Sequence, residues 1–338
     1  MQNSDRRCEA PQGGAISSLD MRNSDRRCAA PQGGAISSLD MRNSDRRCAA
    51  PEGGAITSPA APAVSVIVPT YDRLALLRET MASVLEQTFG DLELIVVDDG
   101  STDGTAEHVR AMTDPRVRLV ALPHGGNVSR ALNAGVAASR ARWLCVLGSD
   151  DVWLPTKLER QMRETLEAGA RWSYTRYELM TAAGAPAPFR SGGSAAVSGW
   201  IARPLLTDEL GVTLCAVMME RSLVDEAGGF REQFRFRQDY DLVVRMALRA
   251  PAHAVDASLV RAREHAGRTT TRTRPEEVLL HHADVFHTLA NEVGDPELQR
   301  IARRKAAALL TAAGKRLVRR GSLWRAARCF VRASATRH

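Results

Sequence analysis

Two adjacent carboxylates, Asp150 and Asp151, follow an apolar run in the stretch LCVLGSDDVWLP at 144–155. Because neighbouring like charges repel, we expect a positive group close to them. Such a pair can bind a hard divalent cation, and Mg²⁺ takes only one or two protein carboxylates beside phosphates and water. It can also accept hydrogen bonds from a sugar, or form a solvated turn, where Asp is common. The residues alone leave these three interpretations open.

Three further acidic residues could likewise serve either chemistry or local structure. Asp98 and Asp99 end another apolar run in VVDDGS, where a carboxylate could hold the base or ribose of a nucleotide. They could equally form a strand-to-helix turn with Ser101 as the cap. Asp239, in RQDYDL, precedes a helical pattern and is either a proton acceptor or an N-cap.

The elements that must position these side chains alternate between strand and helix over residues 64–168. Such alternation predicts parallel strands joined by right-handed crossovers, an α/β Rossmann-like sheet flanked by helices. Ligands of such sheets bind at the carboxyl ends of the strands, and the acidic pairs follow two of these ends. The predicted strands are Val64–Val68, Leu92–Val97, Val117–Leu122 and Trp143–Leu147.

The second half of the chain shows weaker patterns. We expect a loop at Gly184–Gly199, a strand at Thr213–Glu220 and a helix at Asp239–Arg249. A helical C-terminal appendage follows, with helices at 275–291, 297–320 and 323–333. In the last helix the packing stripe is predicted to be Leu323, Trp324, Ala327, Phe330 and Val331.

Three regions follow from this organisation. Residues 1–61 hold tandem repeats of twenty residues, beginning MQNSDRRCEAPQGGAISSLD, and have too few large apolar side chains to offset chain entropy. We expect them to be disordered. Residues 62–272 form the α/β domain, and residues 273–338 form the helical appendage.

Charge and composition narrow the classes of function. The net charge of +7 is concentrated after Asp295, where twelve Lys and Arg face two acids. We expect a solvated basic face there and no nucleic-acid partner, with weak association at a membrane surface as the alternative. No apolar stretch approaches the ~20 residues of a membrane span. The start MQNSDRRC has no apolar signal block, so we expect a cytoplasmic protein, at most peripheral at the inner face of the membrane.

Several segments together resemble a known family. They are VSVIVPTYDR at 64–73, SVLEQTF at 83–89, LELIVVDDGSTDGT at 92–105, NVSRALNAGVAASRARWLCVLGSDDVWLP at 127–155 and GGFRE at 228–232. In order and spacing they resemble family 2 glycosyltransferases of the GT-A fold over residues 64 to 265. The resemblance implies a mostly parallel sheet and an inverting, metal-dependent transfer of a sugar from a nucleotide diphosphate sugar, most readily a UDP-sugar. The acceptor would be a glycan, lipid-linked or protein hydroxyl, as in polysaccharide biosynthesis.

The resemblance also assigns roles to individual positions. Asp99 matches the residue that hydrogen-bonds the nucleotide base, with Asp98 supporting it, and Arg130 matches a basic position near the donor phosphates. Asp151 would contact the metal shell or the sugar. The positions that match donor-binding residues are Pro69, Thr70, Tyr71, Asp98, Asp99, Arg130 and Asp151.

Metal ligation and catalysis fall on three other positions. Asp150 matches the second acid of the DxD motif, which binds Mn²⁺ or Mg²⁺, and His265 resembles a histidine near the donor diphosphate or metal. Asp239 matches the catalytic base. Three departures stand out. Gly148 stands where the family often has the first acid of the DxD motif, Gln238 replaces the usual Glu before the base, and Asp72 stands where Asn is commoner.

Two other classes of protein remain open. A nucleotidyltransferase would use a similar sheet and metal, but it should carry a Gly-rich basic loop after the first strand, where this chain has PTYDR. A non-catalytic nucleotide-sugar-binding protein is compatible with Gly148.

Overall fold

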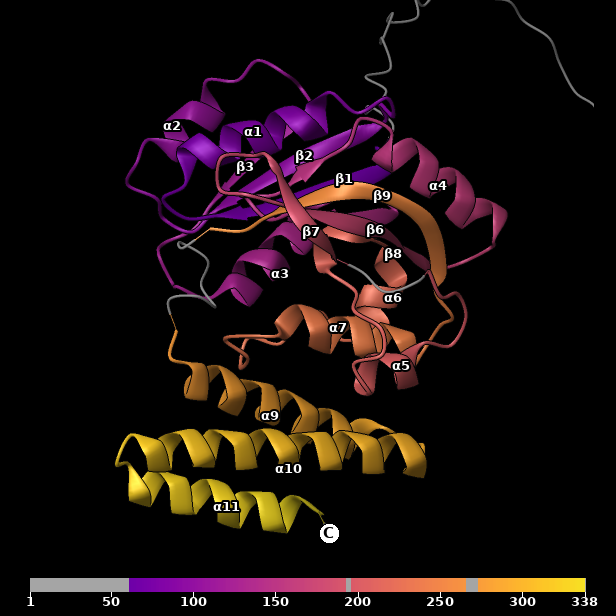
Figure 1. Cartoon of the computed structure of the whole chain (residues 1–338). Helices are drawn as coiled ribbons and strands as arrows, with labels where there is room; N and C mark the ends of the chain where they lie inside the picture. The colour runs from indigo at the N-terminus through magenta and orange to yellow at the C-terminus, as the bar shows by residue number, and fades with distance from the viewer. Residues whose placement is uncertain (1–60, 193–195, 266–272, 338) are drawn as a thin grey trace, which may run out of the picture. The chain divides into compact units, whose positions relative to one another are not determined.

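The computed structural model describes residues 61–192, 196–265 and 273–337, without the side chains of 186–192 and Arg337. The repeats, and the prediction that they are disordered, lie outside the described residues. Within this part of the chain, helices and strands build one large mixed sheet with helices on both faces (Figure 1).

The first four strands form the parallel half of the sheet, in the order β3-β2-β1-β4. Each connection between them carries a helix, so the predicted α/β class and Rossmann-like alternation are confirmed. After β3 the chain crosses to the other side of β1, which makes the β1–β4 boundary a topological switch point. The elements are β1 Val64–Thr70, α1 Leu74–Leu85, β2 Leu92–Asp98, α2 Thr105–Arg110, β3 Val117–Ala121, α3 Val128–Ala138 and β4 Trp143–Val146.

The strands of this half are apolar throughout because both of their faces are covered. In β1, Val64, Val66 and Val68 pack toward α1 and α4, whereas Ile67 packs toward α3 and the C-terminal half. Side chains alternate in the same way along β2 and β4. A continuous apolar run in the sequence therefore corresponds here to a fully buried strand.

Beyond β4 the sheet continues as β8-β6-β9-β5, with antiparallel and parallel pairs mixed and β7 paired to β6. The expectation of a loop at Gly184–Gly199 is wrong in part, because β7 lies within it. The predicted strand at 213–220 begins with a 3-10 turn, Leu214–Ala216. The elements are β5 Val152–Trp153, α4 Lys157–Glu167, β6 Trp172–Met180, β7 Pro186–Gly192, α5 Ala202–Leu206, β8 Val217–Glu220, α6 Arg221–Glu226, α7 Gln238–Ala247 and β9 His253–Arg263.

The three predicted C-terminal helices are present, and they stack in successive layers (Figure 1). Helix α9 (Pro275–Glu292) packs against α7, α10 (Pro296–Arg319) packs against α9 and α5, and α11 (Leu323–Arg337) packs against α10. Apolar residues of α9 and α10 join the core on the α3 face of the sheet. None of the described helices is long and apolar enough to cross a membrane; the cytoplasmic location stays a prediction.

The orientation of α11 differs from the expected one. Its buried face consists of small residues, Ala326, Cys329 and Ala333, and Leu323 and Trp324 point to solvent. The reason is the close approach of α10, where a Cβ on Gly314 would lie 2.7 Å from the Phe330 ring. Gly314 and the small residues of α11 permit this approach, so Leu323, Trp324 and Val331 stay on the exposed face.

A second close approach sets the position of α3. A Cβ on Gly135 would lie 2.4 Å from Ile67 Cγ2 and 3.1 Å from Val97 Cγ2, so the helix rests directly on β1 and β2. Gly135→Val should therefore lower the free energy of unfolding by about 2 kcal/mol or more through overpacking. Gly90→Val, at a position with no atom within 4 Å of the added Cβ, is the control. Equal urea midpoints for the two variants would contradict this packing.

Candidate active site

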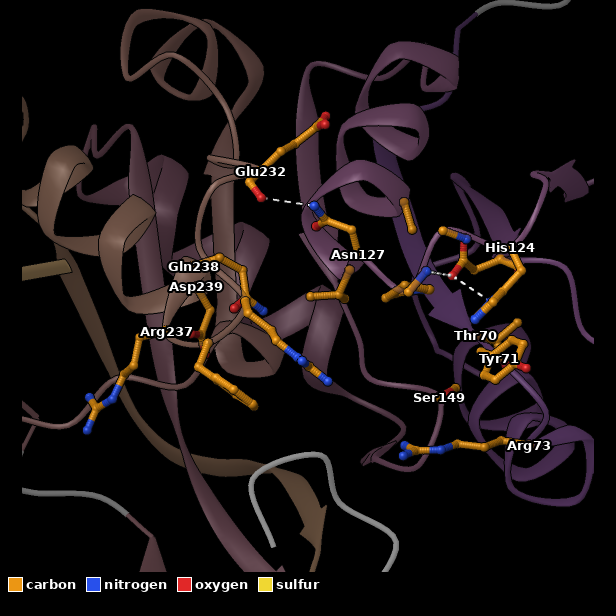
Figure 2. Close-up of a pocket in the computed structure, with 18 of the residues that line it drawn as sticks. Thr70, Tyr71, Arg73, His124, Asn127, Ser149, Glu232, Arg237, Gln238 and Asp239 are labelled. Carbon is orange, nitrogen blue, oxygen red and sulfur yellow. Dashed lines mark hydrogen bonds and ion pairs between the residues drawn. The ribbon is translucent and has the colours of Figure 1, made fainter. Parts of the chain in front are cut away.

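A cavity of about 770 Å³ opens at the carboxyl ends of β1, β2 and β4, at the switch point. Five predicted site residues line it: Pro69, Thr70, Tyr71, Asp99 and Asp239. In Figure 2, Thr70, Tyr71, Ser149 and Arg73 lie on one side, and Arg237, Gln238 and Asp239 lie on the other. The cavity therefore has two walls, one built by the parallel strands and one by the segment that leads into α7.

The end of β1 supplies a polar atom without a protein partner. Thr70 is buried, lines the cavity, and its Oγ1 has no hydrogen bond within the described ranges. A buried hydroxyl in this state costs free energy unless a ligand or water pairs with it. Next to it, the Tyr71 ring stacks on His124, with centroids 4.1 Å apart. The charge of Asp72 raises the pKa of Tyr71, so this phenol stays protonated at neutral pH.

Asp99 is fixed by the turn that precedes α3. Its Oδ1 and Oδ2 accept hydrogen bonds from the backbone N–H groups of Gly125 (3.0 Å) and Gly126 (2.8 Å). His124 Nδ1 lies 2.9 Å from the Asp99 carbonyl oxygen. A carboxylate that accepts two backbone hydrogen bonds is held in one orientation, and Asp99 is held in this way at the lining of the cavity.

Two predicted donor-binding residues lie behind this wall. Asp98 is buried, and its Oδ1 accepts hydrogen bonds from the N–H and hydroxyl of Ser101. Arg130 reaches back over the turn, with Nη1 3.4 Å from the Pro123 carbonyl oxygen. Neither belongs to the cavity lining. Their roles toward a donor stay predictions.

The partners of the acidic pair come from two segments, the loop after β1 and the end of β9. Asp150 Oδ2 accepts hydrogen bonds from Arg73 Nη1 and from His265 Nε2, both at 2.9 Å. Asp151 is buried, and its Oδ1 accepts from the backbone N–H of Arg263 at 3.0 Å. The Arg263 guanidinium in turn donates to the Asp150 carbonyl oxygen. Asp150, Asp151 and His265 lie next to the cavity lining through Arg73 and Ser149, not within it.

Two carboxylate oxygens of the same turn lie close to Gly148. A Cβ on Gly148 would lie 2.9 Å from Asp150 Oδ1 and 3.2 Å from Asp151 Oδ2, so two carboxylate oxygens converge on the space that glycine leaves open. Among the described residues no three His, Cys, Asp or Glu side chains gather into a metal site. This donor set fits a cation that takes one or two carboxylates and completes its shell with phosphates and water.

Asp239 occupies the opposite wall without a structural task. It is the second residue of α7, and the N-cap is Arg237, in the left-handed region at φ 62°, so Asp239 does not cap the helix. No hydrogen bond or ion pair joins its carboxylate to another described side chain. The neighbouring Gln238 Oε1 is buried and likewise unpaired within the described chain. Both residues line the cavity.

Helix α3 holds the loop that carries this wall. Asn127 Nδ2 donates to the Glu232 carbonyl oxygen at 2.9 Å (Figure 2). Asn133 accepts from the N–H of Phe230 (3.0 Å) and donates to its carbonyl oxygen (2.8 Å). The two walls are thus joined by amide hydrogen bonds from a single helix.

A buried ion network fixes the other side of this loop. Asp241 is fully buried and pairs with Arg245 and Arg231. Arg245 also donates to the carbonyl oxygens of Ala227 and Gly229, which close the GGF turn. Asp241 therefore positions the segment around Asp239, and the two acids of the QDYD motif have separate tasks.

Several lining residues were not predicted from sequence. His124, Glu232, Arg235 and Phe236 come from turns whose side chains have no strand or helix period. The available signals were the HGGN turn and the GGFRE motif, which matched the family without indicating that these residues line the cavity.

The sequence and the fold of this chain are similar to those of known glycosyltransferases. Residues 65–176 fit the model of glycosyl transferase family 2. The teichuronic acid biosynthesis glycosyltransferase TuaG of Bacillus subtilis is 36% identical over 127 residues, 37% of this chain and 50% of TuaG. TarS of S. aureus, in complex with UDP-GlcNAc, superposes with a TM-score of 0.59 at 19% identity, over 73% of this chain and 71% of the TarS chain. A mannosyltransferase of Pyrobaculum calidifontis, in complex with GDP-Man and Mn²⁺, gives 0.52 at 19% identity, over 82% and 88%.

The fold is the GT-A fold of these structural neighbours. Residues 65–176 therefore match family 2 glycosyltransferases, and the curated relatives that this chain matches are named glycosyltransferases. It spans between about a third and a half of the length of the first curated relatives that it matches.

Helix α9 contains a histidine next to Arg237 that should make stability depend on pH. Burial, together with the charges of Arg237 and His281, lowers the pKa of His282 to about 4, and its Nε2 accepts from Arg237 Nε. An unfolded histidine binds a proton near pH 6.5, so stability should fall as pH drops from about 6.5 to 4. After discounting for partial exposure we expect a loss of about 1–2 kcal/mol.

His282→Gln should remove this loss, as measured by urea unfolding at pH 7 and pH 4.5. His287→Gln, an exposed position on the same helix, is the matched control and should keep the wild-type pH dependence. A His282→Gln variant with the full wild-type loss would show that His282 takes up its proton normally in the folded protein.

Proposed function

We propose that this domain transfers a sugar from a nucleotide diphosphate sugar to an acceptor hydroxyl, with inversion, in polysaccharide biosynthesis. One observation carries the proposal. The Asp239 carboxylate has no partner among the described residues and lines the same cavity as Thr70 and Asp99, on the wall opposite the strand ends. A free carboxylate facing a donor pocket is the arrangement that deprotonation of an acceptor requires.

The donor occupies the wall built by β1 and β2. Thr70 Oγ1 is an unpaired buried hydroxyl, Asp99 is an oriented acceptor, and the Tyr71–His124 stack is an aromatic surface for a base. The solved neighbours TarS and the Pyrobaculum enzyme are complexes with UDP-GlcNAc and GDP-Man. A UDP-sugar is the first choice here, and dTDP- and GDP-sugars remain candidates.

The diphosphate lies toward the acidic turn after β4. Asp150 and His265 would hold Mn²⁺ or Mg²⁺, with Asp151 Oδ2 beside the same space above Gly148. When bound, the cation supplies positive charge to the leaving diphosphate. Arg73 lines the cavity and pairs with Asp150, so it would add positive charge on the same side of the cavity.

Asp239 removes the proton from the acceptor hydroxyl as the hydroxyl attacks the sugar from the face opposite the diphosphate. Its backbone lies in the first turn of α7, held by the Asn133 and Asp241 contacts, so the carboxylate does not need to move far to reach an acceptor. Positioning both substrates across one cavity contributes much of the acceleration. The acceptor is a glycan, lipid-linked or protein hydroxyl.

Asp239→Asn should leave donor binding unchanged and reduce turnover roughly 10²–10⁴-fold, because the amide has almost the same shape but cannot accept the proton. UDP release from UDP-sugars with Mn²⁺ and an acceptor is the measurement. Asp225→Asn, an exposed carboxylate on the neighbouring α6, is the matched control and should keep full activity.

Equal rates for Asp239→Asn and wild type would refute the assigned base. Nucleotide-sugar binding without turnover in wild type, across a panel of donors and acceptors, would favour a binding protein. Pyrophosphate release from UTP would favour a nucleotidyltransferase.

A further inference from the structure

The outermost C-terminal helix exposes its most apolar face. Leu323, Trp324 and Val331 of α11 are 66%, 75% and 69% exposed. They lie at positions 1, 2 and 9 of the helix and share one side with Ala327, because residues three, four and seven apart fall on the same face. A tryptophan and two aliphatic side chains in one exposed stripe are unusual for a surface that faces only water.

Packing inside the protein does not account for this stripe. The opposite face of α11 contacts α10 through Ala326, Cys329 and Ala333, and Phe330 lies over Gly314. Turning the large side chains inward would require a wider gap between the two helices. The helix is therefore seated by its small residues, and the apolar stripe is left for an external surface.

Basic side chains flank the stripe. Arg325, Arg328 and Arg332 follow one another along one edge of α11, and all three are exposed. The last turns of α10 add four more exposed basic residues, which are Lys315, Arg316, Arg319 and Arg320. From Asp295 to His338 twelve basic residues face only two acids.

We propose that α11 lies in the plane of an anionic lipid bilayer, with Leu323, Trp324 and Val331 in the interfacial region and the arginines at the headgroups. An amphipathic helix with Trp and Leu on one face and Arg beside it has the composition of interfacial helices. The surface charge of anionic lipids complements the basic residues around the stripe.

The same observations disfavour other occupants. A second copy of the chain would bring two strongly basic surfaces together, and their repulsion would oppose burial of the stripe. A nucleic acid would neutralise the arginines but leave Leu323 and Val331 in water. The proposal is independent of the enzymatic activity, because it rests on α10 and α11 alone.

The test is co-sedimentation of the full chain with vesicles of phosphatidylcholine alone or with about 30 mol% phosphatidylglycerol. We expect binding to the anionic vesicles, weakened by added salt, and little binding to the neutral ones. Leu323→Ala with Trp324→Ala should weaken binding roughly tenfold or more. Arg325→Gln with Arg328→Gln should weaken it roughly ten- to thirtyfold.

Matched double variants elsewhere serve as controls. Trp200 and Leu166 are 66% and 55% exposed on other elements, and Trp200→Ala with Leu166→Ala removes similar apolar groups. Arg110→Gln with Arg163→Gln removes the same charge from α2 and α4. Both controls should bind within about twofold of wild type, since neither touches α11.

A second readout keeps the proposal testable if the tail variants lose their fold. In Trp200→Phe, brominated lipid in anionic vesicles should quench the fluorescence of Trp324. Equal binding to neutral and anionic vesicles, equal effects of tail and control variants, or no quenching would overturn the proposal. A dimer dissociated by the Leu323 and Trp324 changes would assign the stripe to a second copy instead.

Discussion

The site depends on the neutralisation of two adjacent carboxylates. Asp150 and Asp151 lie in the turn after β4, at the switch point of the sheet. Without positive groups nearby, each carboxylate would destabilise the charged form of the other. Arg73, from the loop after β1, pairs with Asp150. The end of β9 contributes the backbone N–H of Arg263 to Asp151 and the ring of His265 to Asp150. The acidic turn therefore ties both halves of the sheet together, and Asp150 Oδ1 faces the space above Gly148.

The second wall is held by different means. The loop before α7 is fixed to α3 by the side-chain amides of Asn127 and Asn133, and to the interior by the buried Asp241–Arg245 pair. A buried pair of this kind contributes little net stability but is costly to break, so it serves mainly to fix geometry. These contacts hold the segment that carries Asp239, while the Asp239 carboxylate itself lines the cavity.

The parallel half of the fold was predictable because buried strands with turn residues at their ends leave a local pattern in the sequence. Strand β9 and the pairing of β7 were not, because they depend on partners far away in the chain. The position of the cavity was predictable because acids follow the carboxyl ends of the strands, and Asp99 lines it while Asp150 lies beside it; their roles stay predictions. His124 and Arg73 were missed, because nothing local shows that one stacks on Tyr71 and the other pairs with Asp150. The stripe of α11 was placed inward because periodicity reports an apolar face but not which side its neighbour approaches.

The central claim is that the cavity binds a nucleotide diphosphate through a cation held by Asp150. Titration calorimetry of UDP with and without Mn²⁺, in wild type and in Asp150→Asn, tests it most directly. The account predicts that Mn²⁺ strengthens UDP binding at least tenfold in wild type, and that Asp150→Asn abolishes this gain while metal-free binding persists. Equal UDP affinity with and without Mn²⁺ in wild type, or an unchanged gain in Asp150→Asn, would contradict it.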